Sequence, residues 1–250
     1  MTRAYLFDLD GTLWRGGTPI PHAVETVQAL VARGAQVRYL TNNSSVTGAG
    51  LEAKLEGMGF PVAPGWALGT GPLAASMARE AAYRRVFAVG SPELAESLRA
   101  QGLVVSEDNP DVVLAGICRD FTYDLLARAM QAIRAGVPFW ATNRDTTFPL
   151  EGGRLNPGAG AMVAALEACG GVAPRVIGKP APELILAGLD SCGVAKQEAL
   201  VVGDRIDTDL AAGEAAGVPT WLVLTGVETK LPPGQAGGPD LRSLLMAGER

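Results

Sequence analysis

Short runs of apolar residues alternate with helical patterns along almost the whole 250-residue chain. This alternation is typical of β–α–β units, in which crossover helices join parallel strands. A glycine follows each of the main helical patterns, where a C-terminal cap favours a residue that tolerates positive φ: Gly34, Gly59, Gly102, Gly136, Gly170, Gly193 and Gly217. We therefore predict an α/β fold built on a Rossmann-like, doubly wound parallel sheet.

The same patterns predict the individual elements. Strands are expected at residues 4–7, 36–40, 85–89, 112–115, 138–141, 199–202 and 220–224. Helices are expected at residues 23–33, 49–58, 94–101, 123–135, 161–169, 182–192 and 209–216. A loop rich in proline and glycine, residues 232–239, is expected before a last short helix.

Composition excludes several classes of protein. The formal net charge of −5 and the pI near 5.0 argue against a nucleic-acid binder held by a basic face. The three cysteines are widely spaced, so neither a disulfide framework nor a thiolate metal site is indicated, and a reducing compartment fits best. The sequence has no apolar run long enough for a membrane helix and no signal-peptide pattern. We expect a cytoplasmic protein with no membrane partner.

Polar residues gather where three expected strands end. Asp8 and Asp10 follow the first strand, the run Thr41-Asn42-Asn43-Ser44 follows the second, and residues 204–209 follow a strand near the end of the chain. Ligands of open parallel sheets bind at this edge. The middle of the chain has fewer such clusters, so we predict a core of residues 1–68 and 175–250 with an inserted α/β module, residues 69–174.

The acidic residues at these strand ends point to a metal site. Asp8 and Asp10 are two residues apart, so both carboxylates can enter one space, where they repel each other unless a cation lies between them. Asp204 and Asp209 add two carboxylates, and a set of acids without His or Cys favours Mg²⁺ over Zn²⁺. Taken alone, such aspartates are also typical of ordinary caps and turns.

Hydroxyl, amide and ammonium groups in the same chain fit a phosphate. The run Thr41-Asn42-Asn43-Ser44 precedes an expected helix, so its side chains and free N–H groups can receive phosphate oxygens, although a plain N-cap would use the same residue types. Lys179 also precedes a helix, and its ammonium can neutralise a phosphoryl group or simply be solvated. The joint occurrence of acids, donors and lysine at element boundaries favours phosphate chemistry.

Four ordered motifs resemble those of the haloacid dehalogenase (HAD) superfamily, in the branch that contains NagD, p-nitrophenyl phosphatases and pyridoxal phosphate phosphatase. They are Asp8-Leu9-Asp10-Gly11-Thr12-Leu13, Thr41-Asn42-Asn43-Ser44, Gly178-Lys179-Pro180 and Gly203-Asp204-Arg205-Ile206-Asp207-Thr208-Asp209. The resemblance covers essentially the whole chain. It implies a large α/β cap between the second and third motifs, in agreement with the predicted insertion.

The resemblance also implies a mechanism. Asp8 would be the nucleophile that forms an aspartyl phosphate, and Asp10 the general acid and base. Mg²⁺ would be held by the Asp8 carboxylate, the Asp10 backbone carbonyl and Asp204, with support from Asp209. The phosphoryl oxygens would be bound by Thr41, Asn42, Asn43 and Lys179. The expected partner is a small-molecule phosphate ester, and a homodimer is an oligomeric state that the sequence leaves open.

Substrate choice would rest with the inserted module, because the core motifs contact only the phosphoryl group. By resemblance, Asn143, Arg144 and Asp145 would face the site. Pyridoxal phosphatases of the branch carry a histidine near the position of Phe148. Its absence here argues against pyridoxal phosphate, and the apolar Phe148 fits aryl or nonspecific phosphates. Trp14, in the segment that forms a flap in this family, would either touch the substrate or pack under the cap.

Other activities use similar residues. A phosphoacceptor signalling module also combines aspartates, Mg²⁺, a hydroxyl residue and a lysine, but it is about half this length. A phosphomutase would return the phosphoryl group to its substrate. A haloacid dehalogenase proper attacks carbon and needs neither Mg²⁺ nor a second acid, so Asp10 and Asp204 argue against it.

Overall fold

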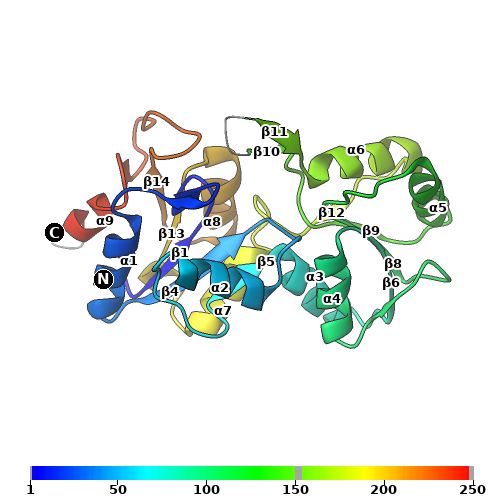
Figure 1. Cartoon of the computed structure of the whole chain (residues 1–250), viewed down its shortest axis with the longest axis horizontal. Helices are drawn as coiled ribbons and strands as arrows, with labels where there is room; N and C mark the ends of the chain where they lie inside the picture. Colours follow the sequence, from blue (N-terminus) through cyan, green and yellow to red (C-terminus); the bar gives the residue numbers. More distant parts are fainter. Residues whose placement is uncertain (1, 150–153, 248–250) are drawn as a thin grey trace. The chain divides into compact units, whose positions relative to one another are not determined.

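The chain forms two compact units, each built around its own parallel sheet (Figure 1). The computed structural model describes residues 2–149 and 154–247. Unit 1 consists of Met1–Thr41, Gly48–Leu68 and Lys179–Arg250, and unit 2 consists of Asn42–Thr47 and Gly69–Gly178. The α/β class and the insertion of a second α/β sheet are confirmed.

Unit 1 is built on a six-stranded sheet. Its strands lie in the order β15 (Gly237–Gly238), β14 (Thr220–Val223), β13 (Ala199–Gly203), β1 (Ala4–Phe7), β4 (Gln36–Thr41) and β5 (Ala67–Gly69). The pairings of β1 with β4 and with β13 are parallel, as are those of β14 with β13 and with β15. β1 is buried along its whole length because strands flank it on both sides and helices cover the sheet.

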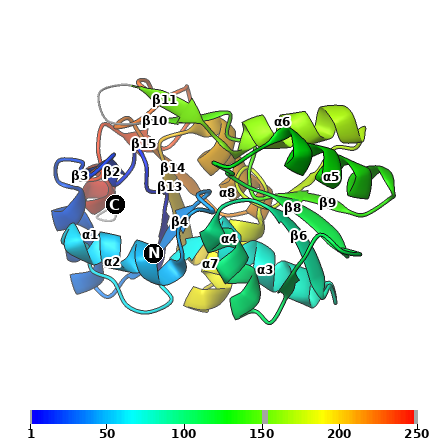
Figure 2. The ribbon, with the colours of Figure 1, turned by 45° about the vertical axis from the view of Figure 1, so that its right-hand side comes forward.

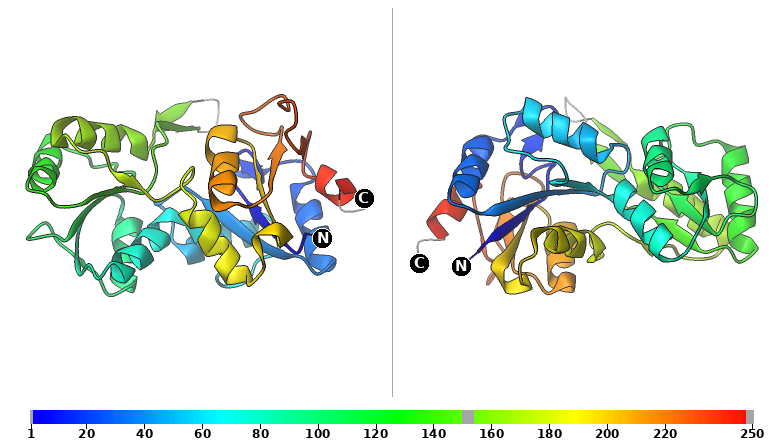
Figure 3. Two further views of the ribbon diagram at one scale, coloured as in Figure 1. Left: turned by 180° about the vertical axis from the view of Figure 1, so that it is seen from behind. Right: turned by 90° about the horizontal axis from the view of Figure 1, so that it is seen from below.

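Helices cover both faces of this sheet (Figure 3). One face is covered by α1 (Ala23–Ala32) and α2 (Gly48–Gly57), and the other by α7 (Glu183–Cys192) and α8 (Ala211–Ala216). The remaining elements are the hairpin of β2 (Trp14–Arg15) and β3 (Thr18–Pro19), a 3₁₀ turn (Lys196–Glu198), a π-helical turn (Ile206–Leu210) and α9 (Ser243–Ala247). The sheet is therefore doubly wound, as predicted.

Unit 2 repeats this architecture on a smaller scale (Figure 2). Its parallel strands lie in the order β12 (Arg175–Val176), β9 (Phe139–Ala141), β8 (Val112–Ala115), β6 (Arg85–Val89) and β7 (Val104–Val105). Its helices are α3 (Thr70–Glu80), α4 (Pro92–Ala100), α5 (Tyr123–Arg134) and α6 (Ala159–Gly170), and an antiparallel hairpin is formed by β10 (Thr147–Pro149) and β11 (Leu155–Pro157).

Alternation along the strands divides the core of unit 2 into two layers. Val86 packs with the apolar side chains of α3 and α4, whereas its neighbour Phe87 packs with those of α5 and α6. Successive side chains of a strand point to opposite faces, so a continuous apolar run is the pattern that a sheet buried on both faces requires.

The structure adds one helix to those predicted and corrects the position of one helix cap. The helix α3 was not predicted, and Gly171, with φ of 75°, caps α6 in place of Gly170. Gly170 instead lies in the last turn of α6, where a Cβ would press on Ile133 of α5. Within the described residues, no helix has the length and apolar character needed to cross a membrane.

Candidate active site

Two acidic residues lie at the topological switch point of the sheet of unit 1. From β1 the chain adds β4 and β5 on one side of the sheet and later adds β13, β14 and β15 on the other side. Asp8 directly follows β1, and its backbone N–H donates to the Val202 carbonyl at 2.8 Å. Asp204 directly follows β13, the strand on the other side of β1 from β4. Such a switch point leaves a crevice at the carboxyl ends of the strands, where ligands of doubly wound sheets bind.

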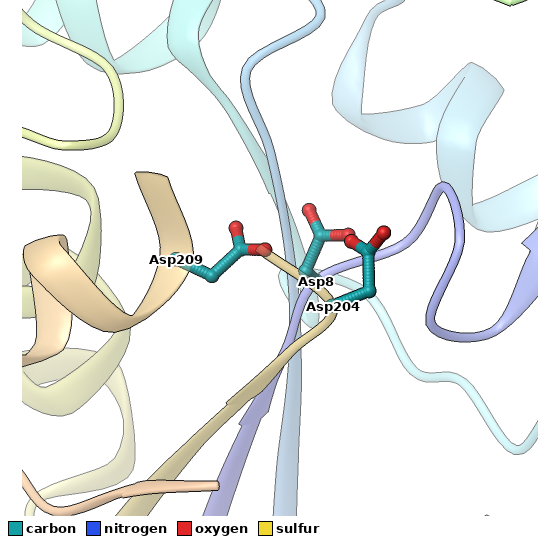
Figure 4. Close-up of side chains that lie close together, drawn as sticks. All are labelled: Asp8, Asp204 and Asp209. Atoms are coloured by element: carbon teal, nitrogen blue, oxygen red, sulfur yellow. The ribbon is translucent and has the colours of Figure 1, made fainter. Parts of the chain in front are cut away.

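A third carboxylate joins them (Figure 4). Asp209 lies on the π-helical turn that follows β13. Asp8, Asp204 and Asp209 each offer a carboxylate oxygen, and these oxygens lie within 4.8 Å of one another. Asp204 and Asp209 are only 1% and 2% exposed. Buried carboxylates this close together require a compensating positive charge.

Lys179 supplies part of that charge. Its Nζ contacts Asp8 Oδ1 at 2.5 Å and Asp209 Oδ1 at 2.7 Å, and the residue is 3% exposed. Three carboxylates and one ammonium give −3 + 1 = −2 when all four groups are ionised. The charge left over matches one divalent cation.

The pKa values of these groups reflect the imbalance. Burial, followed by the Asp209 carboxylate, holds the pKa of Asp8 well above its usual range, although Lys179 acts in the opposite direction. Burial and Asp209 also raise the pKa of Asp204 to about 6. Burial alone would lower the pKa of Lys179, but the two contacting carboxylates outweigh it and raise the pKa. A bound cation would favour the ionised carboxylates.

The site has the features that a metal ion needs. Asp204 Oδ1 is buried and has no hydrogen-bond partner among the described residues, while Asp204 Oδ2 accepts from the Val227 N–H at 2.7 Å. Glycines keep the space around the carboxylates open, because a Cβ on Gly11 or Gly226 would collide with the Asp204 carboxylate. An all-oxygen donor set fits Mg²⁺ better than Zn²⁺.

Asp10 and Thr41 lie in unit 1 but outside this cluster. The Asp10 carboxylate is exposed, and its Oδ1 accepts the indole N–H of Trp14 at 2.8 Å. Thr41 is the last residue of β4 and is buried. The roles predicted for these two residues stay predictions.

The other residues predicted to bind substrate belong to unit 2, where several of them contact one another. The Asn42 carbonyl accepts the Asn143 Nδ2 at 2.7 Å, and the Asn42 side chain donates to Asp145 at 3.3 Å. Asn43 is exposed and its Oδ1 accepts the Ser45 N–H and hydroxyl, so it forms a local turn. Arg144 forms an ion pair with Glu167 on α6.

The segment after β14 also contributes to the site, although its residues were not among those predicted from the sequence. Thr225 donates to the Gly11 carbonyl at 2.7 Å, and the two residues after it approach Asp204, as described above. The signal was present, since Thr225 and Gly226 follow a strand end just as the other polar clusters do. A lone threonine and glycine carry no charge, however, and so resemble an ordinary turn.

Comparison with known proteins identifies the family. A protein-family sequence model described as haloacid dehalogenase-like hydrolase matches residues 5–104, and a second family model, described as HAD-hydrolase-like, matches residues 176–240. The chain is 36% identical to human glycerol-3-phosphate phosphatase, over 90% of this chain and 79% of the relative. The chain belongs to the HAD superfamily. It is also 36% identical to the 5′-nucleotidase YutF of Bacillus subtilis, over 90% of this chain and 88% of that one.

Solved HAD structures refine this placement. The p-nitrophenyl phosphatase from Archaeoglobus fulgidus superposes with a TM-score of 0.91, at 34% identity, over 98% of this chain and 99% of that one. A glycerol phosphate phosphatase from Mycobacterium tuberculosis, solved in complex with magnesium, gives a TM-score of 0.88 at 38% identity, over 97% of this chain and 77% of that one. The predicted NagD and p-nitrophenyl phosphatase branch is confirmed. The chain is a p-nitrophenyl phosphatase-like enzyme of HAD type.

Proposed function

We propose that this chain is a Mg²⁺-dependent phosphatase that hydrolyses small-molecule phosphate monoesters through an aspartyl phosphate on Asp8. The observation that carries the proposal is the buried cluster of Asp8, Asp204 and Asp209 in contact with Lys179, at the switch point of the sheet. Three relatives are named as phosphatases or nucleotidases of glycerol-3-phosphate, 5′-nucleotides and p-nitrophenyl phosphate. These names support the substrate class.

The acidic cluster would hold the metal. Asp8, Asp204 and Asp209, with the backbone carbonyl of Asp10, are the groups that would bind Mg²⁺. When bound, the ion supplies positive charge that favours ionised carboxylates and stabilises the phosphoryl oxygens. The magnesium complex of the Mycobacterium tuberculosis enzyme supports the choice of ion.

The residues divide the reaction into two displacements. In the first, the Asp8 carboxylate attacks phosphorus, the ester P–O bond breaks, and the leaving oxygen takes a proton from Asp10. In the second, Asp10 takes a proton from water, the water oxygen attacks phosphorus, and the acyl-phosphate bond breaks to release inorganic phosphate and free Asp8. Lys179 and Thr41 stabilise negative charge on the transferring group.

We assign substrate selection to the predicted cap of residues 69–174, and we assign binding of the phosphoryl oxygens to Asn42 and Asn43 in the segment that follows β4. The proposed contacts with the substrate are Asn42, Asn43, Asn143, Arg144 and Asp145. The apolar Phe148 favours aryl or nonspecific phosphates over pyridoxal phosphate.

The location and the oligomeric state are separate proposals. The three cysteines, Cys118, Cys169 and Cys192, are free thiols, which supports a reducing, cytoplasmic location. A homodimer stays a prediction.

Hydrolysis of a panel of esters tests the proposal. Glycerol phosphate, a nucleoside 5′-monophosphate, a sugar phosphate and p-nitrophenyl phosphate are each assayed with Mg²⁺ and with a chelator. We expect Mg²⁺-dependent release of phosphate, reduced on the order of 10³-fold or more in Asp8→Asn. The matched control is Asp207→Asn, which removes an exposed partner of Arg205 from the same motif and should retain activity.

The outcomes separate the proposal from its alternatives. No phosphate release from any ester, or near-normal turnover by Asp8→Asn, would refute the phosphatase. Stable phosphorylation of the protein without turnover would favour the phosphoacceptor module. Return of the phosphoryl group to an acceptor, with dependence on a sugar bisphosphate, would favour the phosphomutase.

A further inference from the structure

The side chain of Trp14 is buried beside the exposed carboxylate of Asp10. Trp14 is 1% exposed, yet its indole N–H is a polar group that needs an acceptor when it is buried. That acceptor is Asp10 Oδ1, at 2.8 Å. With so little exposed surface, Trp14 does not offer a ring face to a substrate, which argues against one of the two roles considered from the sequence.

The backbone brings these two residues together. Gly11, with φ of 92°, donates its N–H to the Trp14 carbonyl at 2.8 Å, and the Leu9 carbonyl accepts the N–H groups of residues 12–14. A positive φ is accessible to glycine at no steric cost, so Gly11 allows the chain to turn back within four residues. The turn fixes where the indole lies relative to the carboxylate.

The indole ring is also held from its other sides. Phe60 packs edge-on against it, with ring centroids 6.4 Å apart. The Nζ of Lys54, on α2, lies 4.3 Å from the ring centroid, within the range of a cation–π interaction. Trp14 is thus a rigid donor, and the hydrogen bond restricts the rotation of an otherwise exposed carboxylate.

We propose that Trp14 is a positioning residue for Asp10 in phosphoryl transfer, an inference that rests on the proposed function. The indole N–H occupies Oδ1, so Oδ2 is the oxygen that carries the transferred proton. In the first displacement the Asp10 Oδ2–H bond breaks, a new O–H bond forms on the leaving oxygen, and the ester P–O bond breaks. Trp14 keeps its proton throughout and acts only by orienting the carboxylate.

Dependence on the leaving group distinguishes positioning from a structural role. An alkoxide is a poor leaving group and needs the proton, whereas p-nitrophenolate leaves readily without one. The ratio kcat/KM reports steps up to release of the alcohol, so it isolates the displacement in which Asp10 acts as an acid. Loss of fold or of Mg²⁺ binding would lower kcat/KM for both kinds of ester alike.

The experiment compares Trp14→Phe with wild type and Asp10→Asn. We expect kcat/KM of Trp14→Phe to fall about tenfold or more for glycerol phosphate and about twofold or less for p-nitrophenyl phosphate, the same trend as Asp10→Asn but smaller. In the Asp10→Asn background, Trp14→Phe should add no further dependence on the leaving group. Lys54→Met removes the cation over the ring and leaves the indole N–H, so its ratio between the two esters should match wild type.

Equal losses for both esters in Trp14→Phe, or the same change of ratio in Lys54→Met, would overturn the inference. If Trp14→Phe does not fold, benzothienylalanine at position 14 keeps the two-ring shape, replaces the N–H by sulfur, and is judged by the same ratio. Failure of the proposed function is a separate result, because wild type would then hydrolyse neither ester.

Discussion

At the scale of single residues, charge balance governs the acidic cluster. Lys179 is the cation that contacts both Asp8 and Asp209; its side chain is as buried as that of Asp209 and more buried than that of Asp8. Removing one partner of a buried ion pair costs more than the pair itself contributes, because the remaining charge is left without compensation. Lys179 and a bound divalent cation therefore stabilise the same carboxylates.

This shared role predicts the behaviour of Lys179→Met. We expect its free energy of unfolding to fall by about 3 kcal/mol in a chelator, because the cluster then has three carboxylates and no ammonium. Added Mg²⁺ should restore more stability to the variant than it adds to wild type. Urea unfolding with and without Mg²⁺ measures both effects, and Lys230→Met, at an exposed position, is the control. Equal gains from Mg²⁺ in both proteins would contradict the prediction.

The residues of the site were predictable to different degrees. Asp8, Asp204 and Asp209 could be found from the sequence because an acid that follows a buried strand must lie at the edge of the sheet. The contacts of Lys179 could not, since its partners stand 171 and 30 positions away along the chain. The hydrogen bond from Trp14 to Asp10 depends on a turn geometry that composition does not specify.

At the scale of elements, the loop Asn42–Thr47 packs at the sheet of unit 2, although it contributes no strand to that sheet. It lies at the carboxyl ends of β8, β9 and β12, where Cβ atoms on Gly116 or Gly178 would collide with Ser44 or Asn42. The Asn42 carbonyl accepts hydrogen bonds from Thr70 and Asn143, both at 2.7 Å and both from buried side chains. Unit 2 thus fixes the backbone of a predicted phosphate-binding loop.

Asn143→Ala should loosen this loop. The variant loses the bond to the Asn42 carbonyl and the bond from the Asp145 N–H, so we expect the free energy of unfolding to fall by about 1–3 kcal/mol. Hydrogen exchange should quicken in peptides that cover residues 42–47. Asn156→Ala is a suitable control, because that side chain makes no hydrogen bond with the residues that the structure describes. Unchanged exchange in the loop would show that Thr70 alone holds it.

Some elements could not be predicted because their sequences carry no clear signal, and in each case the reason is physical. Helix α3 begins Thr70-Gly71-Pro72, which reads as a turn, although proline is tolerated in the first turn of a helix, where its missing N–H has no intrahelical partner. Strands of two residues, such as β7 and β12, are too short to show alternation. The longer strands and amphipathic helices were found because their apolar faces must be buried.

At the scale of the whole molecule, the chain carries two parallel sheets with separate cores. The sequence indicated the insertion, because the clusters of polar residues at strand ends were concentrated outside it. It did not indicate that Asn42–Thr47 groups with unit 2, because that grouping depends on hydrogen bonds between residues about 100 positions apart. The proposed metal ligands Asp8, Asp204 and Asp209, with Lys179, all belong to unit 1.

Mg²⁺ should therefore stabilise the two units unequally. A ligand that binds only the folded state adds RT ln(1 + [L]/Kd), about 2.7 kcal/mol at a hundred times Kd, to the unit that holds it. We expect Mg²⁺ to slow hydrogen exchange in peptides of β1, β13 and the π-helical turn, and to leave β6, β8 and β9 unchanged. Mass spectrometry of exchange with Mg²⁺ and with a chelator measures this, and Asp204→Asn should abolish the difference. Equal protection of both sheets would show that the units unfold together, since only one of them contains the acidic cluster.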